Sequence, residues 1–191
     1  FIKGVIDSKS SLMAYTSNIL DLASLQQGKF TLDIKLGVDL IKLSKDVINE
    51  ISPLIIKENK NLHLKLEVKT TKPAIIECDE KRMHQVIYNL LSNAIKYSDY
   101  GTIKLSIDAG KTFVDISVSD QGIGIPKDER SEIFEPFFES SKTKSLAKGK
   151  GLGLSVAQKI IVLHNSTIKV EDNKPKGSVF KFSVSYIFDK K

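Results

Sequence analysis

The chain has 191 residues, of which 41% are hydrophobic and 27% charged, the usual balance of a folded, water-soluble protein. Its net charge is +6, but the lysines are spread along the chain, so charge alone does not favour a nucleic-acid partner. The single cysteine, Cys78, excludes an internal disulfide and a cysteine-based zinc site, which is typical of a reducing compartment. No apolar run reaches the ~20 residues that cross a bilayer. We expect a soluble, cytoplasmic segment, and the sequence leaves open whether other parts of the full-length protein anchor it to a membrane.

Two stretches before residue 60 have the spacing of amphipathic helices. Residues 12–25 place apolar side chains three and four residues apart, and this helix should end at Gly28. No partner segment precedes its apolar stripe, so it is predicted to be half of a helical pair. The second helix is expected over residues 38–59, with Asp39 as its N-cap and Pro53 as a point where it should bend or break.

Strand and helix patterns then alternate to the end of the chain. Strands are predicted at residues 62–68, 74–78, 102–108, 113–119, 166–172 and 178–186, and helices at 79–97 and 151–164. The strands at 102–108 and 113–119 are separated by a short connection and should form a hairpin, so the sheet must be mixed. The predicted fold class is α+β: a two-layer α/β sandwich with helices on one face of a mixed sheet, preceded by a helical segment.

Polar residues interrupt the apolar pattern of the helix at 79–97. Asn89, Asn93 and Lys96 are spaced four and three residues apart and therefore share one helix face. An amide oxygen can ligate Mg²⁺, and a lysine one turn away can contact a phosphate. A solvated helix face gives the same pattern, and the triplet alone does not separate the two interpretations.

The segment DQGIGIP, residues 120–126, follows a predicted strand directly. Asp120 can accept a hydrogen bond from an exocyclic amine, and Gly122 and Gly124 can leave room for a flat ring against the backbone. Pro126 should keep the segment extended. A simple turn built from aspartate and glycine remains the alternative.

The segment GKGLGL, residues 149–154, stands where a loop becomes a helix. Glycines there allow close approach to a ligand, and the free amides of a first helical turn favour anions. The spacing matches neither the P-loop nor the dinucleotide fingerprint. A flexible linker that meets a helix cap is the alternative interpretation.

Four segments in this order resemble the N, G1, F and G2 boxes of two-component sensor histidine kinases: residues 79–98, 120–126, 133–138 (IFEPFF) and 149–164. Residues 19–32 also resemble the second helix of the dimerisation and phosphotransfer hairpin of that family. The resemblance implies a Bergerat-type ATP-binding fold. It divides the chain into an incomplete hairpin at 1–30, a linker and first catalytic-domain helix at 31–60, and an ATP-binding catalytic domain at 61–191.

The same resemblance assigns roles to individual residues. It implies that Asn93 ligates Mg²⁺, that Asn89 lies beside the triphosphate and that Lys96 touches it. Tyr97 would stack on the adenine, and Asp120 would bind its amino group. The remaining residues implied to shape the cofactor cleft or anchor its lid, residues 139–148, are Gly122, Gly124, Ile125, Phe134, Phe137, Phe138, Lys150, Gly151, Leu152, Gly153 and Leu154.

The implied function is that of an ATP-dependent protein histidine kinase. The catalytic region would bind Mg-ATP and transfer the terminal phosphoryl group to a histidine outside this chain, for relay to a response regulator receiver domain. The full-length protein would form a homodimer through its helical hairpin. Related ATPases carry a glutamate at the position of Asn89; an amide cannot take a proton from water, so rapid hydrolysis is disfavoured.

Two departures from the family pattern bear on activity. His63, His84 and His164 are not followed by an acidic residue, so none fits the phosphoacceptor, and each is expected to be structural. Glu132 stands where many members place an arginine that steadies the terminal phosphate. The basic residues available to replace it are Arg130, Lys142, Lys144 and Lys150. A non-catalytic, nucleotide-binding dimerisation module is therefore the alternative function.

Overall fold

The computed structural model describes residues 16–25, 27–142 and 151–188. Residues 16–25 are helical. The following elements are β1 (Lys35–Asp39), α2 (Leu40–Lys57), β2 (Asn61–Val68), β3 (Ile75–Cys78), α3 (Glu80–Tyr97), β4 (Tyr100–Ala109), β5 (Phe113–Ser119), the 3₁₀ turns η1 (Lys127–Glu129) and η2 (Glu132–Phe134), α4 (Gly153–Leu163), β6 (Lys169–Asp172) and β7 (Ser178–Ser185). None of the described helices is both long and apolar enough to cross a membrane.

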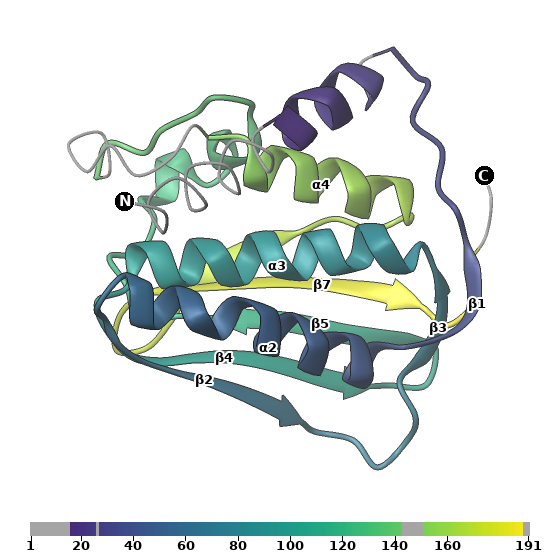
Figure 1. Ribbon diagram of the computed structural model, residues 1–191, viewed down its shortest axis with the longest axis horizontal. Helices are drawn as coiled ribbons and strands as arrows, with labels where there is room; N and C mark the ends of the chain where they lie inside the picture. Colours follow the sequence, from purple (N-terminus) through teal and green to yellow (C-terminus); the bar gives the residue numbers. More distant parts are fainter. Residues whose placement is uncertain (1–15, 26, 143–150, 189–191) are drawn as a thin grey trace, which may run out of the picture.

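A five-stranded mixed sheet in the order β2-β4-β5-β7-β6 forms one layer, and α2, α3 and α4 cover one of its faces (Figure 1). β2 pairs with β4 in parallel, whereas the β4–β5, β5–β7 and β6–β7 pairs are antiparallel. Buried residues alternate along β5 and β7, as a sheet with one covered face requires. The predicted two-layer α+β fold, including its hairpin and mixed sheet, is confirmed.

Helix α3 lies at the centre of the helical layer (Figure 1). Its apolar face is completely buried at Met83, Val86, Ile87, Leu90, Leu91 and Ile95. Each such side chain removed from water stabilises the fold by about 1.5–3 kcal/mol. Asp79 caps the helix as predicted, because its Oδ1 accepts a hydrogen bond from the Arg82 amide at 3.0 Å. The sequence pattern thus fixes both the start of α3 and the face that it buries.

Helix α2 differs from its prediction in one respect. Asp39 caps it as expected, accepting hydrogen bonds from the amides of Ile41 (2.9 Å) and Lys42 (3.1 Å). The expected interruption at Pro53 does not occur, and the helix continues to Lys57. Pro53 is exposed, so its ring faces solvent while buried residues on both α2 and its neighbours hold the helix together. Packing of the apolar stripe therefore outweighs the hydrogen bond that a proline removes.

A short two-stranded sheet lies beside the main one and was not predicted as such. β1, within the stretch expected to contain a linker and a helix, pairs antiparallel with β3. The sequence pattern predicts the strand at 74–78 but does not predict its partner, β1. Nothing in the short run of residues 35–39 identifies β3 as its neighbour, because the pairing joins segments about forty positions apart.

The helical segment 16–25 packs against the helical layer on the side away from the sheet (Figure 1). Leu22 is buried, and the Asp21 carboxylate accepts hydrogen bonds from Arg82 Nη1 and Gln85 Nε2, both at 2.8 Å. A turn at Gln27 and Gly28 follows the segment, as the sequence predicts. Residues 12–15 of the predicted helix lie outside the described residues.

His164 links the end of α4 to the start of α3. Its side chain is 6% exposed, its Nε2 accepts a hydrogen bond from the Asp79 amide at 3.2 Å, and its Nδ1 lies 2.8 Å from the Ile160 carbonyl. Only the neutral ring can accept at Nε2 while donating at Nδ1. Burial lowers the pKa of His164, although the bond to Ile160 and the charge of Asp79 act the other way. These contacts agree with the structural role expected for this histidine.

The folded chain should lose stability in mildly acidic solution because of His164. A depressed pKa means that the unfolded chain binds the proton first, so the stabilisation is complete above the ordinary pKa of 6.5 and is lost as the pH falls below it. Urea unfolding should show that His164→Gln loses less stability than the wild type between pH 7.5 and 5.5. His63→Gln, at an exposed position on β2, should behave as the wild type does. Equal pH dependence in all three proteins would contradict this role.

Candidate nucleotide-binding site

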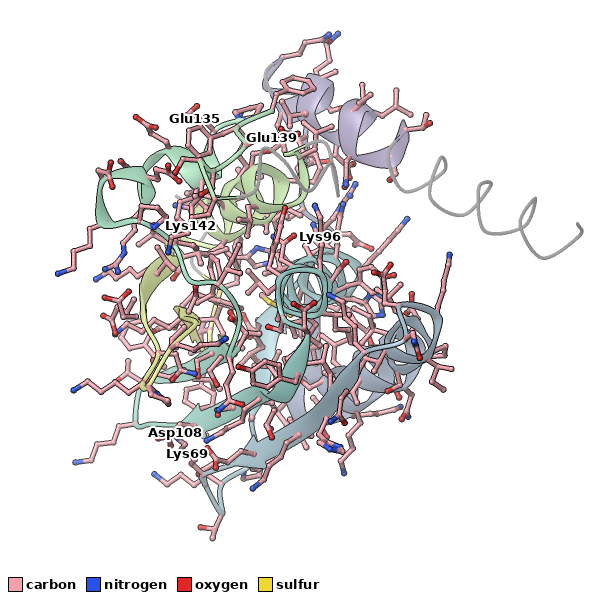
Figure 2. The ribbon with its side chains drawn as sticks, turned by 90° about the vertical axis from the view of Figure 1, so that its left-hand side faces the viewer. Lys69, Lys96, Asp108, Glu135, Glu139 and Lys142 are labelled. Carbon is pink, nitrogen blue, oxygen red and sulfur yellow. The ribbon has the colours of Figure 1, made fainter. Side chains whose placement is uncertain are left out.

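The segments that resemble the N, G1 and G2 boxes meet at one end of the molecule. There α3 and β5 finish and α4 begins, at the left of Figure 1 and facing the viewer in Figure 2. The Ile123 amide donates to the Tyr97 carbonyl at 3.2 Å, which joins the turn after β5 to the end of α3. The Asn89 Nδ2 donates to the Gly153 carbonyl at 3.1 Å, which joins α3 to the start of α4. Residues far apart in the sequence are thereby brought to one place.

Asp120 is a buried carboxylate at the end of β5. Its side chain is 5% exposed, and Oδ1 accepts hydrogen bonds from the amides of Gly122 (2.8 Å) and Ser178 (3.3 Å). Among the described residues, none donates a hydrogen bond to Oδ2. Burial raises the pKa of Asp120, and the two backbone bonds partly oppose that effect. An oriented, desolvated acceptor of this kind suits a donor such as the exocyclic amine of adenine.

The two glycines after Asp120 serve different purposes. A Cβ at Gly122 would lie 2.3 Å from the Tyr97 carbonyl oxygen and 2.8 Å from Ser98 Oγ, so the missing side chain lets the turn approach α3. Gly124 has a φ of +69°, a backbone conformation that favours glycine. The sequence led us to expect room for a flat ring at both positions. The contacts supply a different reason for Gly122, namely close packing against the helix end.

The turn between β6 and β7 packs against the backbone of Asp120, a contact that the sequence pattern does not predict. Gly177 has a φ of +103°, and a Cβ there would lie 2.0 Å from the Asp120 carbonyl oxygen. Asn173 Nδ2 donates to the same carbonyl at 2.7 Å. In the sequence, only the glycine just before the final strand indicates this turn. The backbone of Asp120, which the turn contacts, is more than fifty positions away. Gly177 is thus a site residue that pattern alone does not identify.

Substituting Gly177 should destabilise the fold far more than substituting another glycine of positive φ that lies in open space. Gly37 has a φ of +74° and no atom within 4 Å of its Cβ position. We expect Gly37→Ala to cost about 1–2 kcal/mol from backbone strain alone. Gly177→Ala adds a clash with the Asp120 backbone and should cost more than about 3 kcal/mol in urea unfolding. Similar losses in the two variants would show that this close approach is unimportant.

The polar face of α3 lies beside this turn. Asn89, Asn93, Lys96 and Tyr97 are all half-buried. Lys96 Nζ lies 4.6 Å from the centre of the Tyr97 ring, a cation–π contact, and Figure 2 shows Lys96 on the side of α3 away from the sheet. No cluster of three or more histidine, cysteine or acidic side chains that could hold a metal occurs within the described ranges.

The segment before α4 is tied to the segment IFEPFF. Gly151 has a φ of +66°, its carbonyl accepts a hydrogen bond from the Phe137 amide at 3.0 Å, and a Cβ on it would lie 2.6 Å from the Phe138 carbonyl oxygen. The helix begins at Gly153 without a side-chain cap, so backbone amides of its first turn are available to an anion. Lys150 and lid residues 143–148 lie outside the described part of the chain.

The other residues predicted to bind the cofactor differ in burial and in location. Leu152 is buried, and Ile125 and Leu154 pack half-buried against the core. Phe134 makes an edge-to-face contact with Phe180, at 6.5 Å between ring centres. It also lines an open groove of about 790 Å³ between η2, α4 and β6, which contains no other residue of the predicted cofactor set. Phe134 thus supports the core and this groove, which is distinct from the end at which Asp120 lies.

The candidates to replace the missing arginine also differ in position. Glu132 is exposed, and Arg130 forms an ion pair with Asp172 on β6. The hydrogen bond from Arg130 is the main reason that the pKa of Asp172 is lowered, and the positive charge of Arg130 acts in the same direction. Lys142 Nζ donates to the Ile123 carbonyl at 3.0 Å, beside the turn that carries Asp120. Lys144, like Lys150, is outside the described residues. Of the two candidates that the structure describes, Lys142 is the one placed against that turn.

The family described as "Histidine kinase-, DNA gyrase B-, and HSP90-like ATPase" matches residues 78–186. The chain belongs to this family. Its matched region starts just before α3 and ends after β7, so it contains all the segments that build the candidate site. Within the family, the sequence and structural relatives identify it as the catalytic ATP-binding domain of the sensor histidine kinase type.

Among curated relatives, the chain is 30% identical over 94% of its length to the circadian input-output histidine kinase CikA of Synechococcus elongatus. It is 32% identical over 91% of its length to the sensor histidine kinase RcsC of Escherichia coli. The chain spans 24% and 18% of these two relatives, so it corresponds to a quarter or less of their length.

Solved structures give the same fold. The histidine kinase AdeS of Acinetobacter baumannii superposes with a TM-score of 0.76 at 25% identity, covering 97% of this chain and 83% of that chain. The full-length protein ShkA, solved in complex with AMPPNP, has a TM-score of 0.81 at 25% identity and covers 100% of this chain and 39% of that chain. The catalytic domain of the histidine kinase ThkA has a TM-score of 0.70 at 31% identity, covering 82% and 99%.

Proposed function

We propose that this chain binds Mg-ATP and transfers its terminal phosphoryl group to a histidine outside the chain, for relay to a response regulator. The observation that carries the proposal is Asp120, a buried carboxylate with one oxygen directed to no described donor, at the junction of α3, β5 and α4. Family membership and the AMPPNP complex of ShkA support nucleotide binding at such a site.

Within this proposal each segment has a separate task. Asp120 accepts a hydrogen bond from the adenine amino group, and Tyr97 stacks on the ring. Lys96 and the amides that begin α4, from Gly151 to Leu154, hold the phosphates. Asn93 ligates Mg²⁺ through its amide oxygen, and Asn89 lies next to the phosphates. When bound, the metal neutralises charge that develops on the transferred group.

Asn89 favours transfer over hydrolysis. Its Nδ2 is engaged by the Gly153 carbonyl, and a neutral amide cannot remove a proton from an attacking water. An acceptor imidazole brings its own nucleophilic nitrogen. In the proposed step the bond from that nitrogen to the γ-phosphorus forms while the bond to the bridging oxygen of ADP breaks, so no protein base is needed to activate water.

A response regulator is the proposed final acceptor. Support comes from the solved complex of the histidine kinase ThkA with the response regulator protein TrrA, which has a TM-score of 0.71 to this chain at 27% identity. We further propose that the full-length protein dimerises through a helical hairpin to which residues 16–25 belong. Leu20 in that segment is 62% exposed, as expected for an apolar side chain that contacts a second helix in the dimer.

Replacing Asp120 tests the nucleotide site directly. We expect wild-type affinity for Mg-ATP in the micromolar to submillimolar range, and Asp120→Asn should weaken it by at least about tenfold in isothermal titration calorimetry, because the desolvated acceptor for the base loses its charge. Asp108→Asn, at an exposed position on β4 well away from Lys96 in Figure 2, should bind as the wild type does. Unchanged affinity in Asp120→Asn would refute the site.

The thermal stability of Asp120→Asn shows whether a loss of affinity could result from unfolding. The pKa of Asp120 in the folded protein is raised above 3.8, so the protonated carboxyl group stabilises the fold at low pH. This stabilisation is lost as the pH rises through the folded pKa. The ionised carboxylate of Asp120 therefore destabilises the folded state at pH 7.5. Without nucleotide, Asp120→Asn should melt no lower than the wild type at that pH, so reduced affinity cannot be attributed to unfolding.

The alternative is a nucleotide-binding module without transfer, favoured by the exposed Glu132 at the position of the usual arginine. Radiolabelled ATP should be mixed with this chain and with a separate helical hairpin carrying an acceptor histidine, and a hairpin with that histidine changed to glutamine serves as control. Acid-labile label on the first hairpin alone supports transfer. Binding without label supports the alternative, and rapid phosphate release without any hairpin would indicate a hydrolysing ATPase.

A further inference from the structure

Lys60, in the connection between α2 and β2, carries a buried ammonium group. Its side chain is only 5% exposed, and its Nζ donates hydrogen bonds to the carbonyls of Ile95 (2.7 Å), Lys96 (2.8 Å) and Ser98 (2.7 Å). The carboxylate of Asp99 lies 3.6 Å from Nζ, and its side chain is 83% exposed. An ammonium has three N–H donors, so backbone carbonyls take the full set.

These carbonyls form the end of α3. The last carbonyls of a helix have no partner within it and carry partial negative charge, so a cation placed among them satisfies and stabilises them. Glycine in the left-handed conformation often closes a helix, but Ser98, which follows α3, has an extended backbone with φ −118° and ψ 142°. Lys60 therefore takes the place of a conventional C-cap.

The carbonyl that Lys60 does not use belongs to the candidate site. Tyr97 lies between Lys96 and Ser98, and its carbonyl accepts the Ile123 amide at 3.2 Å. Gly122 packs against the same oxygen, which a Cβ at that position would approach to 2.3 Å. Of the four consecutive carbonyls at 95–98, three thus bind the ammonium and the fourth holds the turn that follows Asp120. Movement of the helix end would shift that turn.

We infer that Lys60 is a positioning residue for nucleotide recognition: its ammonium fixes the end of α3 and, through the Tyr97 carbonyl, sets the place of Asp120 relative to the base. The inference rests on the proposed function, since it assigns the base to Asp120. Lys60 touches no nucleotide in this scheme. Its effect should therefore appear in discrimination between bases, because the 6-amino group of adenine donates to a carboxylate whereas the 6-oxo group of guanine repels it.

The test is the ratio of the dissociation constants for GTP and ATP, measured by calorimetry on the 191-residue chain with Mg²⁺ at a temperature well below unfolding. In Lys60→Met, which keeps most of the aliphatic length without donors, ATP affinity should fall by about tenfold and GTP affinity by less than about twofold. The preference for ATP should shrink accordingly. A purely structural role would reduce the folded fraction and weaken both nucleotides equally, which leaves the ratio unchanged.

A matched control is Val114→Ala. Val114 is fully buried near the start of β5, at the end of the strand away from Asp120, so the substitution destabilises the core away from the turn that carries Asp120. Its ratio should equal that of the wild type. If Lys60→Met does not fold, Lys60→Gln, which is neutral and too short to reach all three carbonyls, is measured in the same way.

The outcomes separate the two proposals. A wild-type preference for ATP that survives intact in the folded Lys60 variant overturns the role of Lys60 and leaves the proposed function standing. A wild-type chain that binds neither nucleotide, or binds both equally, overturns the assignment of Asp120 to adenine, on which the inference depends. Loss of the preference in Val114→Ala as well would show that any destabilisation abolishes it, and would also overturn the role of Lys60.

Discussion

The candidate site depends on how closely the turn after β5 approaches the end of α3. That approach is possible because Gly122 lacks a side chain where a Cβ would meet the Tyr97 carbonyl oxygen, and because the Ile123 amide bonds to that same oxygen. Asp120 is held between this contact and the β6–β7 turn, where Gly177 lies directly against its backbone. A carboxylate packed from both sides has little freedom to move, which is what recognition of a single donor requires.

Two buried charges at this end of the molecule are stabilised by the backbone. Asp120 accepts from the amides of Gly122 and Ser178, and Lys60 donates to three carbonyls at the end of α3. Isolated charges are costly inside a protein unless their hydrogen-bonding groups are satisfied. Backbone partners offer fixed dipoles whose positions are set by the fold. The two charged groups therefore depend on the local backbone conformation, and their hydrogen bonds in turn stabilise that conformation.

The helical layer connects the phosphate side of the site to the rest of the protein. Asn89 joins α3 to α4 through the Gly153 carbonyl, and Arg82 and Gln85, near the start of α3, hold Asp21 of the helical segment 16–25. The same helix thus contacts both the proposed phosphate-binding turn and the segment that resembles a dimerisation helix. Contacts of this kind place the two parts in one packed structure, and their energetic coupling is open to measurement by double-mutant cycles.

Local pattern was sufficient for much of this protein. The period of apolar residues located α3 and the β4–β5 hairpin, Asp39 and Asp79 were recognised as caps, and four ordered motifs pointed to the histidine kinase family. Each of these depends on residues close together in the chain. The continuation of α2 through Pro53, the β1–β3 pairing, and the roles of Gly177 and Lys60 depend on atoms 35 or more positions away, or on the balance between packing and a lost hydrogen bond. Which carbonyl a buried ammonium reaches, or which backbone a glycine admits, is decided only when the layers pack, because no sequence period encodes a distance between segments.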